Sequence, residues 1–106
     1  MPIPINEAIK PPSGSIAVMF ITKIKPEAYD DGYHETSERM ISLVKDQPGF
    51  LGAESTRGDD GFGITISYWK DDASVKAWRE NPEHALAMQK GRGWYDVYTT
   101  VRTVVR

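Results

Sequence analysis

The nine-residue stretch Ile16–Ile24, with the sequence IAVMFITKI, constrains the fold more than any other part of the 106-residue chain. It is rich in β-branched and aromatic residues, which favour a strand. Successive side chains of a strand point to opposite faces, and here both faces are apolar: Ile16, Val18, Phe20 and Ile24 lie on one, and Ala17, Met19 and Ile21 on the other. We therefore expect this strand to lie inside a sheet that is covered on both sides.

The residues after this strand predict a helix and then a hairpin. Pro26 suits the first turn of a helix, and an apolar stripe continues the helical pattern to about Asp46. Gln47-Pro48-Gly49 ends that helix, and a second strand begins at Phe50. The polar turn Asp59-Asp60-Gly61 then leads into a return strand, FGITISYW, which starts at Phe62.

The second helix is predicted to be broken. Asp71 or Asp72 caps a short first part, and Asn81-Pro82 restarts the helix as an N-cap and first-turn pair. Gly91 and Gly93 are expected to close it in a left-handed turn. A last strand runs from about Tyr95 to Val105 and carries Tyr95, Val97, Val101 and Val105 on one face.

This order, β-α-β-β-α-β, predicts the α+β class: a ferredoxin-like split βαβ fold with a four-stranded antiparallel sheet and both helices on one face. Phe20, Val18 or their alternates then point to the helix-free face, so we expect a homodimer that covers this apolar surface. The domain spans residues 16–106. Residues 1–15 contain four of the seven prolines and form either an extended arm or a disordered segment.

Composition removes several functional classes. The chain has no cysteine, and its two histidines, His34 and His84, are far apart in sequence, so we expect no metal. It also lacks a Gly-rich dinucleotide fingerprint, and we expect no cofactor. A net charge of −2 with scattered Lys and Arg argues against nucleic acid as a partner. No apolar run is long enough for a membrane and no secretory signal is evident, which favours a cytoplasmic location.

The region from Ile16 to Arg106 closely resembles the antibiotic biosynthesis monooxygenase family of dimeric α+β barrel proteins. The pieces that carry this resemblance are Tyr68-Trp69, Trp78, Asn81-Pro82-Glu83-His84, Gln89, Gly91-Arg92, Trp94-Tyr95 and Tyr98. The resemblance implies oxidation of a small phenolic, anthrone or quinol-like compound by O₂ without metal or flavin. The deprotonated substrate itself would supply the electron to oxygen. A haem-binding role is disfavoured, because Met88 stands where the haem-degrading relatives carry an axial His ten positions after Trp78.

The resemblance also implies roles for individual residues. His84 and Tyr68 are the catalytic candidates, as proton acceptor and hydrogen-bond donor. The candidate substrate-binding residues are Phe20, Trp69, Trp78, Gln89, Trp94, Tyr95 and Tyr98. Trp94 and Tyr95 are expected to point to opposite faces of the last strand, so that at most one of them lies on the helix side.

Each of these residues also has a purely structural interpretation. The aromatic residues suit a core, and His84 suits a polar edge position bonded to Glu80 or to a backbone carbonyl. Two functional hypotheses therefore remain. The favoured one is a cofactor-independent monooxygenase acting on a small aromatic molecule, and the other is a non-catalytic dimer that binds a small hydrophobic compound or serves in a stress response.

Overall fold

A computed structural model describes residues 10–106 of the chain, and its sheet is built around β1 (Ile16–Ile24). This strand pairs antiparallel with β3 (Phe62–Trp69) on one side and with β4 (Tyr95–Val104) on the other. The remaining strand, β2 (Phe50–Arg57), pairs with β3, so the strand order is β2-β3-β1-β4. The inner position expected for β1 and the four-stranded antiparallel ferredoxin-like sheet are both confirmed.

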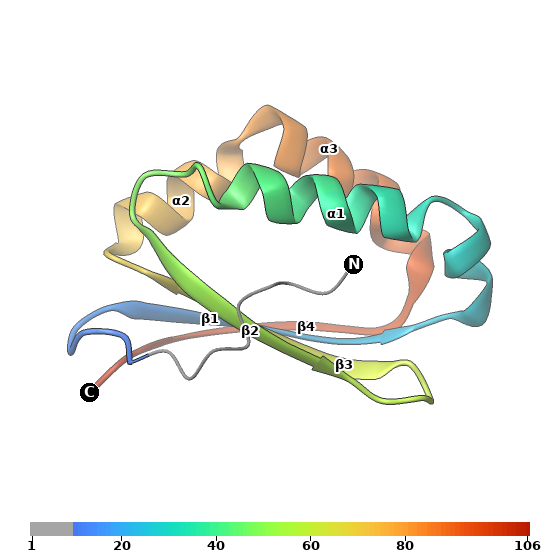
Figure 1. Cartoon of the computed structure of the whole chain (residues 1–106), viewed down its shortest axis with the longest axis horizontal. Coiled ribbons are helices and arrows are strands. Elements are labelled where there is room, and N and C mark those ends of the chain that lie inside the picture. Colours follow the sequence, from blue (N-terminus) through green and yellow to red (C-terminus); the bar gives the residue numbers. More distant parts are fainter. Residues whose placement is uncertain (1–9) are drawn as a thin grey trace.

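Three helices, α1 (Tyr33–Val44), α2 (Asp72–Glu80) and α3 (Pro82–Lys90), cover one side of the sheet (Figure 1). The predicted break between α2 and α3 is confirmed. The Asn81 side chain accepts hydrogen bonds from the amides of Glu83 and His84, at 3.0 and 3.1 Å. None of the helices in the described part of the chain is long and apolar enough to cross a membrane.

Two expectations about helix ends were wrong. The first helix is not continuous, because the 3₁₀ turn η1 (Pro26–Asp30) is separated from α1 at Gly32, whose φ of 85° interrupts the helical path. Gly91 does not adopt a left-handed conformation, since its φ is −81°, and it opens the second 3₁₀ turn, η2 (Gly91–Trp94). Gly91 instead provides space: an added Cβ would lie 3.0 Å from Cε3 of Trp94.

The arm predicted for residues 1–15 is described only in part, because residues 1–9 lie outside the described residues. The end of the predicted arm is attached to the C-terminal end of the chain. The Gly14 amide donates to the Val105 carbonyl, and the Val105 amide donates to the Ser15 carbonyl, both at 2.8 Å.

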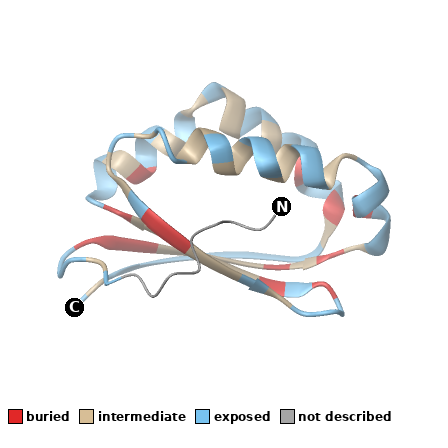
Figure 2. Cartoon of the chain, viewed as in Figure 1, coloured by how far each residue is buried: buried red, intermediate tan, exposed pale blue. Residues whose placement is uncertain are grey.

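Two separate apolar clusters join the helices to the sheet. Ile16, Trp69 and Val75 form one cluster, while Ile24, Ala28 and Trp94 form the other. The clusters lie at opposite ends of β1, about 26 Å apart at the ordinary strand rise of 3.3 Å per residue. Between them, α1 contributes no buried residue, and Figure 2 shows it only in the colours of half-buried and exposed residues.

In β3 most apolar side chains point away from the helices, whereas an amphipathic strand normally directs its apolar side chains towards them. Because Trp69 packs against Val75 of α2, alternation places Ser67, Thr65 and Gly63 on the helix side. The apolar residues Phe62, Ile64, Ile66 and Tyr68 point to the helix-free side. On β1 the same alternation leaves Phe20 beneath the helices and directs Met19 and Ile21 to the helix-free side, so the alternates, and not Phe20 and Val18, form that apolar surface.

A register shift brings Tyr95 to the helix side of β4. Lys23 pairs with Val97, but Ile24 pairs with Tyr95, so the strand gains one residue at this point. The expectation that Tyr95 shares a face with Val97 was therefore wrong. Trp94 precedes the strand, in η2, and both Trp94 and Tyr95 contact the cluster around Ile24. The expectation that at most one of them lies on the helix side was also wrong.

The turn between β2 and β3 offers a direct stability test. Gly61 has a φ of 88°, and an added Cβ would lie 2.6 Å from the Ile24 carbonyl oxygen. We predict that Gly61→Ala lowers the free energy of unfolding by about 2 kcal/mol or more, since the left-handed conformation alone costs about 1–2 kcal/mol. Gly93→Ala is the control, because no atom lies within 4 Å of the added Cβ. Equal urea midpoints for the two variants would contradict the prediction.

Candidate functional site

Three aromatic rings meet on the helix side of the sheet, between the two apolar clusters. The Phe20 ring lies 5.8 Å from that of Tyr95 and 4.9 Å from that of Tyr98, and both contacts are edge-to-face. The two tyrosine rings are 5.7 Å apart. Phe20 and Tyr95 are half-buried and Tyr98 is 48% exposed, so solvent reaches these rings although they belong to the inward face. Phe20, Tyr95 and Tyr98 were all predicted as substrate-binding residues, and the structure brings them together.

Two polar residues complete this group. Thr22 is fully buried beside Tyr98, its partner in β4. The guanidinium of Arg57 reaches it from the end of β2, where Nη2 donates to Thr22 Oγ1 at 3.0 Å and Nη1 donates to the Gly61 carbonyl at 2.5 Å. We refer to Phe20, Thr22, Arg57, Tyr95 and Tyr98 as the tyrosine cluster.

Because Gly63 has no side chain, the Arg57 guanidinium can lie across β3 and reach Thr22 on β1. Gly63 lies between Arg57 and Thr22 in the row of paired residues across the sheet. A Cβ at Gly63 would be 2.9 Å from Cζ of Arg57, so the guanidinium lies directly over this glycine. A small residue at this position is therefore needed for Arg57 to reach β1.

Tyr95 supplies a hydrogen-bond donor to this cluster. Burial raises its pKa well above the ordinary value, with a smaller contribution from the nearby Tyr33. The phenol therefore stays protonated across the physiological range. Its hydroxyl has no hydrogen-bond partner among residues 10–106. Such a hydroxyl is available to donate to a ligand oxygen.

His84 belongs to a different group, a stack of three rings. The indoles of Trp69 and Trp78 are stacked at 6.2 Å, and the His84 imidazole is stacked on Trp78 at 3.9 Å with an angle of 12° between the planes. Trp69 is 1% exposed and pairs with Ile16, whereas Tyr95 pairs with Ile24 at the other end of β1. The stack and the tyrosine cluster therefore occupy different ends of the sheet.

The hydrogen bond of His84 fixes its tautomer. Nδ1 lies 2.8 Å from the Trp78 carbonyl oxygen, which only accepts, so Nδ1 carries the proton. Burial lowers the pKa of the imidazole, although this same hydrogen bond acts in the opposite direction. His84 is thus a neutral, half-buried residue bonded to a backbone carbonyl, as its structural interpretation expected.

The other predicted site residues do not converge with either group. Tyr68 lies on the helix-free side, where its hydroxyl donates to Glu54 Oε1 at 2.9 Å, and this bond is the main cause that raises its pKa. Trp94 is buried in the cluster around Ile24, and its indole Nε1 donates to Asp31. Gln89 is exposed on α3. The expected meeting of His84 with Tyr68 is therefore not observed within one chain.

Sequence reasoning missed Arg57 and Thr22. The available signal was the alternation of β2 and β3, which places Ser55, Arg57, Thr65 and Ser67 on one face together with Gly63. Small polar residues with a single cation on the inward side of a sheet are unusual for a core. That pattern pointed to a polar region beneath the helices.

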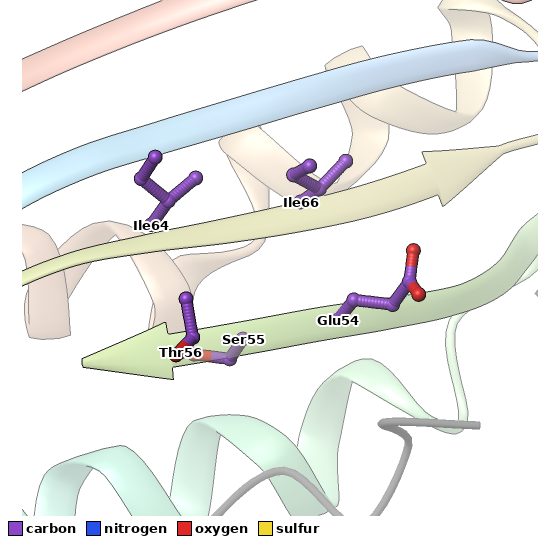
Figure 3. Close-up of a pocket in the computed structure, with 5 residues that line it drawn as sticks. All are labelled: Glu54, Ser55, Thr56, Ile64 and Ile66. Atoms are coloured by element: carbon purple, nitrogen blue, oxygen red, sulfur yellow. The ribbon is translucent and has the colours of Figure 1, made fainter. Parts of the chain in front are cut away.

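Two shallow depressions lie away from the tyrosine cluster. The larger, about 440 Å³, is formed on β2 and β3 by Glu54, Ser55, Thr56, Ile64 and Ile66 (Figure 3). The other, about 260 Å³, lies between α1 and α3 beside the ion pair of Arg39 with Glu83. Neither contains a set of acidic and histidine side chains for a metal, and residues 10–106 contain no such set elsewhere.

The fold and the tyrosine cluster together describe a ferredoxin-like α+β protein with a polar, aromatic region beneath its helices. Residues 15–90 match the sequence pattern of a family described as antibiotic biosynthesis monooxygenase. The chain belongs to the antibiotic biosynthesis monooxygenase family.

Two relatives differ in how much is known of them. The chain is 48% identical over 90 residues to the Bacillus subtilis protein named "Uncharacterized protein YqjZ", covering 84% of this chain and 78% of that protein. It is 29% identical over 80 residues to a jasmonate monooxygenase of Pyricularia oryzae, covering 72% of this chain but only 36% of that protein.

Solved structures support the fold. SnoaB from Streptomyces nogalater, described as a cofactor-independent oxygenase, superimposes with a TM-score of 0.71 at 16% identity, covering 90% of this chain and 95% of that one. A dimeric ferredoxin-like protein of unknown function from Bacteroides fragilis gives 0.67 at 14% identity, covering 86% and 96%.

The state of His84 predicts a pH dependence of stability. Its folded pKa lies below the ordinary 6.5, so the folded protein binds this proton less readily than the unfolded chain. The stability that neutral His84 provides is present above about 6.5 and is lost as the pH falls through the folded pKa. His84→Phe keeps a ring on Trp78 and removes the titration. We expect the urea midpoint of the wild type to fall more steeply than that of His84→Phe below this pH, and parallel curves would contradict this.

Proposed function

We propose that this protein is a cofactor-independent monooxygenase that oxidises a small phenolic, anthrone or quinol-like compound with O₂ at the tyrosine cluster. The observation that carries the proposal is the unpartnered, protonated hydroxyl of Tyr95 beside the rings of Phe20 and Tyr98. Membership of the family and the distant monooxygenase relatives agree with it.

The reaction needs little from the protein. An anthrone-type substrate loses a proton to water and transfers one electron to O₂. The substrate radical and superoxide then combine to a peroxide anion, which takes a proton back from water and becomes a hydroperoxide. Loss of water from the hydroperoxide leaves a carbonyl, so one oxygen atom enters the product and the other leaves as water. The protein contributes a site that holds the ring and a donor for the negative oxygen.

In this proposal, Phe20 and Tyr98 contact the faces and edges of the substrate ring, and Tyr95 donates to its oxygen. The substrate proton leaves to water, because the rings of the cluster are partly exposed. His84 is assigned to holding the junction of α2 and α3, since it is stacked on Trp78 and bonded to its carbonyl. Tyr68 is assigned to the helix-free side with Glu54.

Tyr95→Phe tests the proposal with little structural change. The variant keeps the ring but loses the donor, and removal of one such donor typically costs about 10²-fold or more in turnover. We expect kcat for an anthrone or quinol substrate, measured as oxygen consumption, to fall by about this factor. Tyr29→Phe is the control, because Tyr29 is exposed and packs on Tyr33 and His34. Equal turnover by both variants would contradict the role of Tyr95.

One observation favours the non-catalytic alternative. The tyrosine cluster contains no carboxylate or imidazole that accepts a proton, and His84 lies in a separate stack. A protein that only binds an aromatic compound needs no such group. If the wild type binds anthrone- or quinol-like compounds but consumes no oxygen with any of them, the binding interpretation replaces the enzymatic one.

The protein is further proposed to act as a homodimer joined through the helix-free side. Met19, Ile21, Ile64 and Ile66 all point to this side, and no helix of the described chain covers it. A contiguous apolar surface of this kind is typical of a subunit interface. The Bacteroides fragilis neighbour, which is described as dimeric, is consistent with this arrangement.

We expect Ile64→Lys to give a monomer or an aggregate, because its cross-strand partners, Ile21 and Thr56, offer no carboxylate and a buried ammonium group without a partner is costly. Leu86→Lys is the control, since Leu86 is 65% exposed on α3 and a charge there remains in water. Light scattering at micromolar concentration distinguishes the two. A monomeric wild type, or an Ile64→Lys variant that remains dimeric, would contradict the proposed interface.

A further inference from the structure

Arg57 is a half-buried cation without an acidic partner. The described chain contains two other arginines in ion pairs, Arg39 with Glu83 and Arg102 with Asp72, and both pairs are on the surface. Arg57 instead donates to two neutral oxygens, Thr22 Oγ1 and the Gly61 carbonyl, and no carboxylate among residues 10–106 pairs with it. Two of its five N–H donors are thus used, and its positive charge is not neutralised.

The position of this charge relates it to the tyrosine cluster. Arg57, Gly63, Thr22 and Tyr98 lie in one row across the sheet, and Tyr95 is paired with Ile24 nearby. The guanidinium interacts with the Tyr95 hydroxyl of β4, whose pKa its charge acts to lower against the larger effect of burial, and Tyr33 and Tyr98 lie beside Tyr95. Asp60, which precedes Gly61 in the turn, is exposed and accepts from the Phe62 amide. Asp31 is also exposed and accepts from the Trp94 indole.

We propose that the Arg57 guanidinium binds the deprotonated oxygen of an aromatic ligand, so that the site selects phenolates and enolates over the corresponding neutral compounds. This rests on the proposed function in one respect, that an aromatic ring occupies the tyrosine cluster. A guanidinium in a partly buried place binds an anionic oxygen more strongly than it would in water, because the surroundings screen the charge less. The only ligand bond that breaks is O–H, and its proton goes to water.

The Arg57 guanidinium is held in a fixed orientation on the sheet, which favours binding of an anionic oxygen over a neutral hydroxyl. The guanidinium is fixed at both Nη atoms and lies over Gly63, so it is held in place before a ligand arrives. A donor that is already oriented binds without further loss of side-chain entropy. Tyr95 can then donate to the same oxygen from β4, on the far side of β1, which favours the anion over a neutral hydroxyl.

The test uses 4-nitrophenol, whose phenolate absorbs visible light, with the full-length protein. The apparent pKa of the bound phenol is obtained by titrating absorbance at saturating protein, and turnover is not required. We expect the wild type to lower this pKa by about one unit or more, the effect of a neighbouring guanidinium on an acidic group. Arg57→Gln should abolish the shift, and Arg57→Lys should retain part of it. Arg92→Gln, which removes an exposed arginine of η2, should match the wild type.

Each result bears on the proposal. A wild type that leaves the pKa of 4-nitrophenol unchanged, raises it, or shows no saturable binding at millimolar concentration overturns the role of Arg57, whether or not Arg57→Gln folds. A shift that survives in a folded Arg57→Gln variant also overturns it. A shift that depends on Arg57, in a protein that consumes no oxygen, supports the phenolate site while the proposed oxygenase activity fails.

Discussion

The structure depends on which way the apolar side of the sheet faces. In β3 the isoleucines and Tyr68 point away from the helices, while Gly63, Thr65 and Ser67 lie beneath them. Burial of apolar surface is the main favourable contribution to folding and association, so a sheet with this alternation must bury its outer side elsewhere. On β3 the inner side is left to small and polar residues as far as Trp69. The same constraint therefore accounts both for the proposed dimer and for the polar region under the helices.

The two apolar clusters attach the helices to the sheet on either side of a more polar middle stretch. Val75 and Trp69 attach α2 at one end, and Ala28, Ile24 and Trp94 attach η1 and η2 at the other. Interiors are normally close-packed, yet between these ends Val18 and Phe20 of β1 are only half-buried, and the fully buried side chain is the polar Thr22. The tyrosine cluster lies in this stretch, where the sequence supplies rings, a guanidinium and hydroxyl groups instead of aliphatic side chains.

Local signals in the sequence were enough for most of the elements. Alternation and turn residues predicted β1, β2 and β3, and capping residues predicted the break at Asn81-Pro82, because these features act through the nearest neighbours along the chain. The break at Gly32 and the short turn at Gly91 were missed, since the first depends on a single φ value and the second on the space needed by the Trp94 ring.

The candidate site was less predictable, because it depends on contacts between distant segments. Phe20, Tyr95 and Tyr98 come together only because of the register shift opposite Lys23 and Ile24. No residue in the sequence predicts that shift. Tyr68 was expected near His84, but it alternates with Trp69 and therefore lies on the opposite side of the sheet. The sequence does not show that Trp69 faces the helices, because this follows from its contact with Val75 of α2. Arg57 is placed in the site by its hydrogen bond to Thr22, which is 35 positions away in sequence.

The central claim is that the two sides of this sheet have different partners, a ligand on one and a second subunit on the other. Methyl NMR of protein labelled at isoleucine and threonine measures both at once. We predict that a phenolic ligand shifts the methyl signals of Thr22 and Thr65, while dilution to the monomer shifts those of Ile21, Ile64 and Ile66. Ligand-induced shifts confined to the isoleucines of the helix-free side, with the threonine signals unchanged, would contradict it.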